Sequence, residues 1–218
     1  MIDIVIIGQN EAQSIRQMYG ALRPYLYNRV WVLDRCTDDS EMLLQSLGER
    51  SFKTPSCWMG RQTSAARNFG LRKCCPSNDV LFLDGDRFPV EGNLKALEMW
   101  DKDVALLLLE KDGRALIDDY AEVYGEVYNY FYSCGVFLKR KAIEKITGFQ
   151  RGELFNEELQ GVWGIEDTYL GDVCYHLGLT CDIYRECLLR GCFDKESVDS
   201  LDVIEKRFKS REKLNVKW

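Results

Sequence analysis

The chain has 218 residues, a formal charge of −6, and 46% hydrophobic and 29% charged residues. This length and composition are typical of one large globular domain or two small ones, and they exclude a disordered chain. The acidic balance excludes the broad basic surface of a general nucleic-acid binder, so we expect no nucleic-acid partner.

No segment has the features of a membrane span or of a secretion signal. The longest purely apolar run, residues 104–109, is far shorter than the roughly 20 residues that a spanning helix needs. The N-terminal run contains Asp3 and lacks a basic start, so it predicts a first strand and no signal peptide. We therefore expect a cytoplasmic protein without an integral membrane segment, whose nine cysteines are mostly reduced.

The first half of the chain alternates apolar runs with amphipathic stretches. The apolar runs predict strands at residues 3–7, 30–33, within 51–58 and at 80–83, and the periodic stretches predict helices at 15–22, 42–47 and 63–73. Repeated βαβ units predict a mainly parallel sheet with helices on both faces. Because ligands bind beyond the carboxyl ends of such strands, we expect functional residues just after Ile7, Leu33 and Leu83.

The second half of the chain is less regular. We predict a helix at 89–100, strands at 104–109 and 134–138, a short helix at 141–147 and a helix over 170–177. The tyrosines of the aromatic stretch 120–132 recur at helical spacing, which favours a packed face over a sugar-binding surface. His176, the only histidine, is interpreted as a packed structural residue.

The absence of a linker or repeat predicts one α/β domain over residues 1–184. We divide it into a nucleotide-binding half, 1–100, and an acceptor-side half, 101–184. Residues 185–218 form a C-terminal appendage with an amphipathic, highly charged helix. This helix is expected to dock on the domain or on a partner, or to lead into further domains.

Two acidic pairs carry the candidate chemistry. Asp84-Gly85-Asp86 directly follows the strand at 80–83, and the glycine lets both carboxylates aim at one point above the sheet edge. Mg²⁺ or Mn²⁺, held together with diphosphate oxygens, suits these ligands and would stabilise a nucleoside-diphosphate leaving group. Taken alone, Asp-Gly is also a common turn dipeptide.

The second pair, Glu166-Asp167, begins a predicted helix just after Trp163. Acidic residues in a first helical turn are often simple partners of the helix dipole. A carboxylate beside a metal site is also a candidate general base that takes the proton from an acceptor hydroxyl. Both interpretations stay open when the pair is viewed alone.

Six segments in chain order resemble the GT-A glycosyltransferases, especially the large family 2 group. They are residues 4–11, 32–40, 66–71, the DxD-like 82–86, the segment 134–149, and the WGxED segment 163–167, which is like that of galactosyl- and N-acetylgalactosaminyltransferase relatives. The resemblance covers about residues 2–184. It implies a GT-A fold, a Rossmann-like α/β/α sandwich in a single domain.

The resemblance implies donor-site roles for the residues that follow the first strands. The nucleotide-sugar would contact Ile7, Gly8, Gln9, Asp34, Arg67, Asp84 and Gly85. Within this set the base and ribose would lie against the first strand and Asp34, and Arg67 would lie near the base or the diphosphate. Asp86, together with Asp84, would bind the metal. Gln9 departs from the family pattern, because an aromatic residue usually stands there.

The same resemblance implies the acceptor side of the site. Asp167 would be the general base of an inverting displacement, and Glu166 would assist it and help to bind the acceptor. Trp163 is a candidate for stacking on the acceptor sugar because it stands beside this base in the chain, with buried packing as the alternative. Related segments also occur in retaining enzymes, so that outcome stays open.

These roles predict a metal-dependent enzyme that transfers a sugar from a nucleotide-sugar, with a UDP-sugar favoured, to a hydroxyl of a glycan or protein-linked sugar. Two other functions stay open. A sugar-phosphate nucleotidyltransferase needs a glycine-rich loop after the first strand, where this chain has only Gly8. A non-catalytic nucleotide- or sugar-binding domain has no need to retain both acidic pairs.

Overall fold

The computed structural model describes residues 1–55, 63–111, 114–115, 131–159 and 165–191. Its strands are β1 (Ile2–Gly8), β2 (Asn28–Leu33), β3 (Ser51–Lys53), β4 (Asp79–Asp84), β5 (Arg87–Gly92), β6 (Val104–Lys111), β7 (Arg114–Ala115), β8 (Gly135–Leu138) and β9 (Cys181–Gly191). Its α-helices are α1 (Ala12–Leu22), α2 (Ser40–Ser46), α3 (Thr63–Leu71), α5 (Arg140–Phe149) and α6 (Ile165–His176). Short 3₁₀ helices lie at Leu94–Met99 and Glu157–Leu159.

All the described strands join one sheet, in the order β3-β2-β1-β4-β8-β6-β9-β5, with β7 beside β6. The neighbours β3, β2, β1 and β4 are parallel, and so are β6 and β9. Strand β8 enters antiparallel between β4 and β6, while β5 and β7 run antiparallel along β9 and β6. Six described strands therefore share one direction, which confirms the predicted α/β fold with a mainly parallel sheet.

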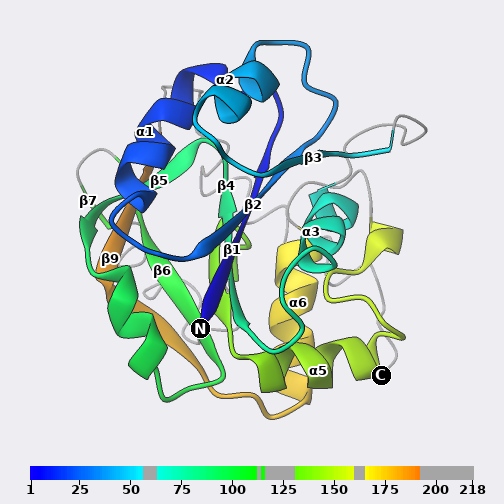
Figure 1. Cartoon of the computed structure of the whole chain (residues 1–218). Helices are drawn as coiled ribbons and strands as arrows, with labels where there is room; N and C mark the ends of the chain where they lie inside the picture. The colour runs from blue at the N-terminus through cyan, green and yellow to red at the C-terminus, as the bar shows by residue number, and fades with distance from the viewer. Residues whose placement is uncertain (56–62, 112–113, 116–130, 160–164, 192–218) are drawn as a thin grey trace.

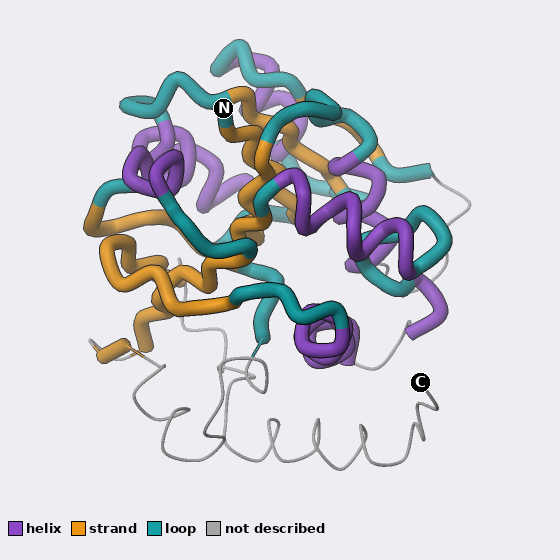
Figure 2. Tube along the Cα trace, turned by 90° about the horizontal axis from the view of Figure 1, so that it is seen from below, coloured by secondary structure: helices purple, strands orange, loops and turns teal. Residues whose placement is uncertain are grey.

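Helices cover both faces of this sheet. Figure 1 shows α1 and α2 on one side and α3, α5 and α6 on the other, and Figure 2 shows the strands between the helices. Strand β1 is central and buried on both faces, so its run Ile2, Ile4, Val5 and Ile6 has no exposed surface. A strand buried on both faces is a continuous apolar segment in the sequence, so its position could be predicted from the sequence.

The predicted helix at 89–100 is wrong. Residues 87–92 form β5, which pairs with β9, and only residues 94–99 are helical. Pro89 is compatible with β5 because that strand is at the end of the sheet, where a missing N–H is tolerated. Gly92, with φ of +106°, ends the strand, and the Asn93 side chain then caps the 3₁₀ helix by accepting from Lys95 N.

Strand β9 was not predicted. It crosses residue 184, so residues 185–191 are part of the central sheet and pair with β5 and β6. The helix expected further along, at 197–214, lies outside the described residues, as does the aromatic stretch at 120–130. None of the helices in the described ranges has the length and apolar character needed to cross a membrane.

We predict that helix α3 tolerates no side chain at position 70, where it touches β1 and β2. A Cβ at Gly70 would lie 2.4 Å from Val5 Cγ1 of β1 and 3.0 Å from Val32 Cγ2 of β2. Gly70→Ala should therefore lower the free energy of unfolding by about 1–3 kcal/mol in urea denaturation. The control is Gly20→Ala on the exposed part of α1, where no atom lies within 4 Å and a gain of about 0.5–1 kcal/mol is expected. The same sign for both variants would contradict the close contact.

Candidate functional site

The carboxyl ends of β1, β2 and β4 are joined through their backbones. Gly85 N donates to Ile7 O at 2.7 Å, and Asp34 N donates to Gly8 O at 2.8 Å. The turn after β4 and the turn after β2 are thus fixed to the end of β1. The structure therefore brings together Ile7, Gly8, Asp34 and Gly85, as the positions of the strands predicted.

The turn that carries Asp84-Gly85-Asp86 is held on two sides. Besides the bond from Gly85 N to β1, the buried Ser14 hydroxyl of α1 donates to Gly85 O at 2.7 Å. The Glu11 side chain crosses this point, and a Cβ at Gly85 would lie 3.0 Å from Glu11 Cγ. Sequence reasoning gave Ser14 and Glu11 no such role, although a serine on the buried face of an amphipathic helix was a signal for one.

The loops after β1 and β2 also lock into each other. Asn10, with φ of 61°, accepts from Thr37 N at 2.7 Å, and Asp38 accepts from Ala12 N at 2.9 Å. Asp38 therefore caps α1 from the neighbouring loop, since it satisfies an N–H group that has no partner within the helix. Gln9, at the start of this loop, is exposed.

The Asp34 carboxylate is bound by its own neighbours. Arg35 donates to both of its oxygens, at 3.0 and 2.6 Å, and the Thr54 hydroxyl donates at 2.9 Å. Arg35 has φ of 51°, a left-handed backbone that is uncommon for a residue with a side chain. A nucleotide that contacts Asp34, as predicted, would therefore also lie next to the Arg35 guanidinium.

A buried guanidinium links the two acidic pairs. Arg67 of α3, whose side chain is 4% exposed, places Nη2 2.7 Å from Asp84 Oδ1, and Nη1 is 4.0 Å from Glu166 Oε1. Thr63, one turn earlier on α3, donates to Glu166 Oε1 at 2.9 Å. Burial opposes the charged form, but the charges of Asp84, Asp167 and Glu166 outweigh it, and the pKa of Arg67 is raised.

Two nitrogens of this guanidinium have no acceptor among the described residues. Arg67 Nε and Nη1 are buried and make no hydrogen bond within the described part of the chain. The Phe155 ring covers the guanidinium, with 5.5 Å from Cζ to the ring centre, and also packs edge-on against Phe82 of β4. Buried polar groups are nearly always paired in folded proteins, so these N–H groups indicate a site that a polar ligand or water completes.

Asn68, next to Arg67, fixes the segment that carries Phe155. Its Oδ1 accepts from Leu154 N and Phe155 N, at 3.2 and 3.0 Å, and its Nδ2 donates to Phe155 O and Glu157 Oε1, at 2.7 and 3.0 Å. The amide thus uses all of its hydrogen-bonding capacity. The segment 66–71 was matched as a motif, but this function of Asn68 was not predicted from it.

The second acidic pair is buried at the start of α6. Asp167 accepts a hydrogen bond from the Ser133 hydroxyl, and Glu166 contacts α3 as described above. Trp163, the expected acceptor-binding residue, lies outside the described residues. His176 is at the other end of α6, where its ring contacts Phe149.

The described residues do not form a closed metal cage. No three His, Cys, Asp or Glu side chains among them lie close enough together to hold a metal ion by themselves. Asp86 is half-buried in the turn after β4, and Asp84 accepts a hydrogen bond from Arg67 with one of its two carboxylate oxygens. Such a donor set fits Mg²⁺ or Mn²⁺, because these ions are commonly held by one or two carboxylates together with substrate phosphates and water.

We predict that the Asp38 cap stabilises the fold only when the carboxylate is ionised. Burial alone would raise the pKa of Asp38, but hydrogen bonds from Ser40 and Ala12 outweigh it and hold the pKa below its ordinary value. Asp38→Ala should lower the free energy of unfolding by about 1 kcal/mol at neutral pH. Because the folded-state pKa is lowered, this difference should fade as the pH falls below the ordinary aspartate range, about 4.

The measurement is urea denaturation of both proteins from pH 7 to pH 3. Asp39→Ala is the control, since the Asp39 side chain makes no capping hydrogen bond. A loss of stability in Asp38→Ala that is the same at every pH would argue against the ionic cap.

The sequence matches no protein-family profile and no curated protein, but solved structures share the fold. S. aureus TarS 1-349 aligns with a TM-score of 0.66 at 16% identity, over 88% of this chain and 60% of that chain. Glucosyl-3-phosphoglycerate synthase from Mycobacterium tuberculosis, in complex with Mg²⁺ and UDP, aligns with a TM-score of 0.65 at 18% identity, over 97% of this chain and 79% of that chain.

A longer TarS structure aligns over the whole of this chain but only 40% of its own, with a TM-score of 0.68 at 16% identity. The chain thus spans at most 60% of the TarS structures. Identities this low show the fold and not the activity. The chain has the GT-A-type fold of these glycosyltransferases.

Proposed function

We propose that the chain is a glycosyltransferase that moves a sugar from a nucleoside-diphosphate sugar to an acceptor hydroxyl. The observation that carries this is the buried cluster in which Arg67 joins Asp84, at the end of β4, to Glu166, at the start of α6. The turn proposed to bind the donor and the start of α6, which carries the candidate base Asp167, thereby lie at one edge of the sheet, where α/β folds bind ligands. We favour a UDP-sugar as donor and a glycan or protein-linked sugar as acceptor.

The solved structures of similar fold support this donor. Complexes of glucosyl-3-phosphoglycerate synthase contain UDP with Mg²⁺, and UDP-glucose with Mn²⁺ and phosphoglyceric acid. These ligands were bound by those proteins and not by this chain. The carboxyl edge of the sheet in this chain nevertheless carries groups that suit the same ligands, namely carboxylates for a divalent cation and Arg67 for a diphosphate. The turn after β1 also lacks the additional glycines that the alternative, a nucleotidyltransferase, would need.

The charge of the cluster supports metal dependence. When ionised, Asp84, Asp86, Glu166 and Asp167 carry four negative charges, and Arg67 carries one positive charge, a formal sum of −3. A diphosphate adds further negative charge, so it would be repelled from this edge without a cation. We infer that Asp86, with Asp84, holds Mn²⁺ or Mg²⁺. When bound, this ion would neutralise charge that develops on the departing diphosphate.

Side chains of the protein would remove the proton of the acceptor hydroxyl. In the proposed step Asp167 takes the proton of the acceptor hydroxyl, whose oxygen attacks the anomeric carbon as the bond from that carbon to the diphosphate oxygen breaks. A single displacement of this kind inverts the configuration at that carbon. Arg67 is charge-coupled to the Asp167 carboxylate, so a fixed positive charge acts on the proposed base. Glu166 and Trp163 are proposed to bind the acceptor.

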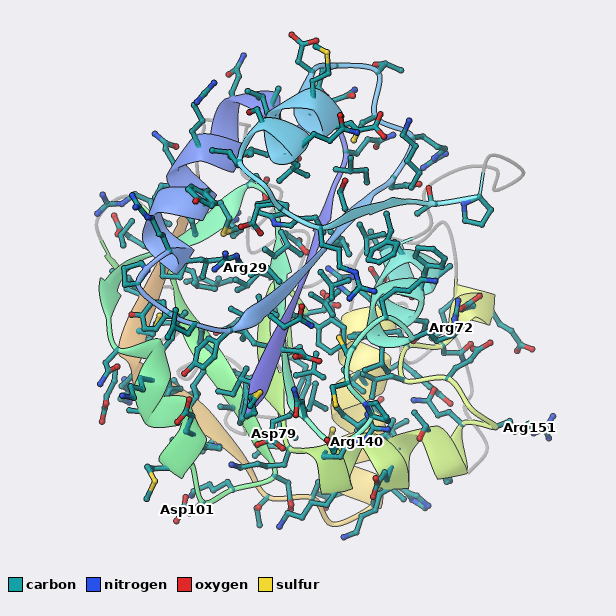
Figure 3. The ribbon with its side chains drawn as sticks, viewed as in Figure 1. Arg29, Arg72, Asp79, Asp101, Arg140 and Arg151 are labelled. Carbon is teal, nitrogen blue, oxygen red and sulfur yellow. The ribbon has the colours of Figure 1, made fainter. Side chains whose placement is uncertain are left out.

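We predict metal-dependent binding of one nucleotide. Calorimetric titration with UDP, GDP, TDP and CDP, with and without Mn²⁺, should give heat for UDP only when Mn²⁺ is present. Asp86→Asn should weaken that binding by roughly ten-fold or more, because it removes a metal ligand. Asp101→Asn is the matched control, since Asp101 is exposed and lies at the opposite end of the molecule (Figure 3).

The outcomes separate the competing functions. Binding that Asp86→Asn weakens to that extent and Asp101→Asn leaves intact supports the donor site. Heat from none of the four nucleotides, in either condition, would contradict the transferase and leave a domain without nucleotide chemistry as the better account.

We also predict that Asp167 acts in the reaction and not in donor binding. Asp167→Asn should bind UDP and Mn²⁺ as the wild type does, while the release of UDP from a UDP-sugar falls roughly 100- to 10,000-fold, because the base is lost. Glu166→Gln should instead raise the KM for the acceptor more than it lowers kcat. Unchanged turnover in Asp167→Asn would exclude it as the base.

A further inference from the structure

Ser133 is brought to the proposed active site by the direction of one strand. Strand β8 is antiparallel to β4, and Gly135 of β8 pairs with Leu83 of β4. The residues just before β8 therefore lie beside the residues just after β4, at the carboxyl edge of the parallel strands. No local pattern singles out a serine there, because the direction of β8 is not visible in the sequence.

The segment that carries Ser133 is firmly anchored. Phe131 and Tyr132 are buried, and the Tyr132 hydroxyl donates to Leu107 O of β6. Ser133 itself is 1% exposed. Its hydroxyl therefore has little freedom to turn to another partner or to solvent.

That hydroxyl donates to Asp167 Oδ1, so it joins the start of β8 to the first turn of α6. Asp167 is buried, and its charge acts on Arg67 of α3, as do the charges of Asp84 of β4 and of Glu166. Among these contacts Ser133 contributes a directional hydrogen bond without a charge. A carboxylate that only complements a helix dipole does not need a buried hydroxyl from a distant strand.

We propose that Ser133 is a positioning residue for Asp167: its hydroxyl holds the carboxylate in one orientation and stabilises its ionised form. The consequence for turnover rests on the proposed function, in which Asp167 is the base. The contact between the hydroxyl and the carboxylate does not depend on that function. The two claims can therefore fail separately.

The test compares three variants. Ser133→Ala removes the hydroxyl, Ser133→Thr keeps it, and Tyr132→Phe removes the adjacent buried hydroxyl that donates to Leu107 O. Tyr132→Phe is the matched control, since it removes one buried hydrogen bond in the same segment, and that bond goes to Leu107 O of β6. A merely structural role for Ser133 predicts that Ser133→Ala and Tyr132→Phe behave alike.

The first readout is independent of activity. Carboxyl ¹³C resonances of aspartate are followed against pH, with Asp167→Asn used to assign the signal of Asp167. Ser133→Ala should move the midpoint of that titration up by about one pH unit, because the ionised form loses a donor. Ser133→Thr and Tyr132→Phe should leave it in place. Equal midpoints in Ser133→Ala and Tyr132→Phe would overturn the proposal.

The second readout is the release of UDP from a UDP-sugar as a function of pH. Ser133→Ala should lower kcat roughly ten- to hundred-fold and move the acidic limb of the profile to higher pH, with the donor KM unchanged. Ser133→Thr should recover much of that loss. A shifted Asp167 titration in a protein that releases no UDP would support the positioning contact and contradict the proposed transfer reaction. A kcat that Ser133→Ala leaves unchanged would contradict the catalytic part of the proposal.

Discussion

The guanidinium of Arg67 is the contact on which the arrangement of this site depends. It lies between Asp84, at the end of β4, and Glu166, at the start of α6, two residues far apart in the sequence. A charge removed from water is stable only when opposite charges and hydrogen bonds replace its hydration. Helix α3, strand β4 and helix α6 must therefore keep their relative positions. The excess of carboxylates around one cation supports the proposal that a metal ion binds at this edge.

The rest of the fold holds α3 so that Arg67 stays in place. Gly70 lets the helix approach β1 and β2 closely, and Asn68 ties it to the segment that carries Phe155. Phe155 in turn covers the guanidinium. At the other end of the sheet, Asp79 of β4 accepts from Arg140 N and caps α5; both residues are labelled in Figure 3. Structural polar contacts thus occupy the amino edge, and the candidate chemistry occupies the carboxyl edge.

Most strands of the first half of the chain could be predicted from local patterns of apolar residues, whereas two strands, β5 and β9, could not. Strands β1, β2 and β4 are buried on both faces and so appear as continuous apolar runs. Strand β9 mixes charged residues such as Arg185 and Glu186 with apolar ones, and β5 contains Pro89, so neither resembles a buried strand. Both were missed because their pairing with each other, and of β9 with β6, decides their structure.

The sequence by itself determined the alternation of strands and helices, and it placed Asp34 and Asp84-Gly85-Asp86 directly after buried strands. These features are local, since burial periodicity and turn chemistry act over a few residues. Only the tertiary structure decided that Arg67 joins the two acidic pairs and that Ser133 contacts Asp167. The physical reason is that such contacts depend on sheet order and strand direction, which bring distant residues to one edge and leave no periodic signal in the chain.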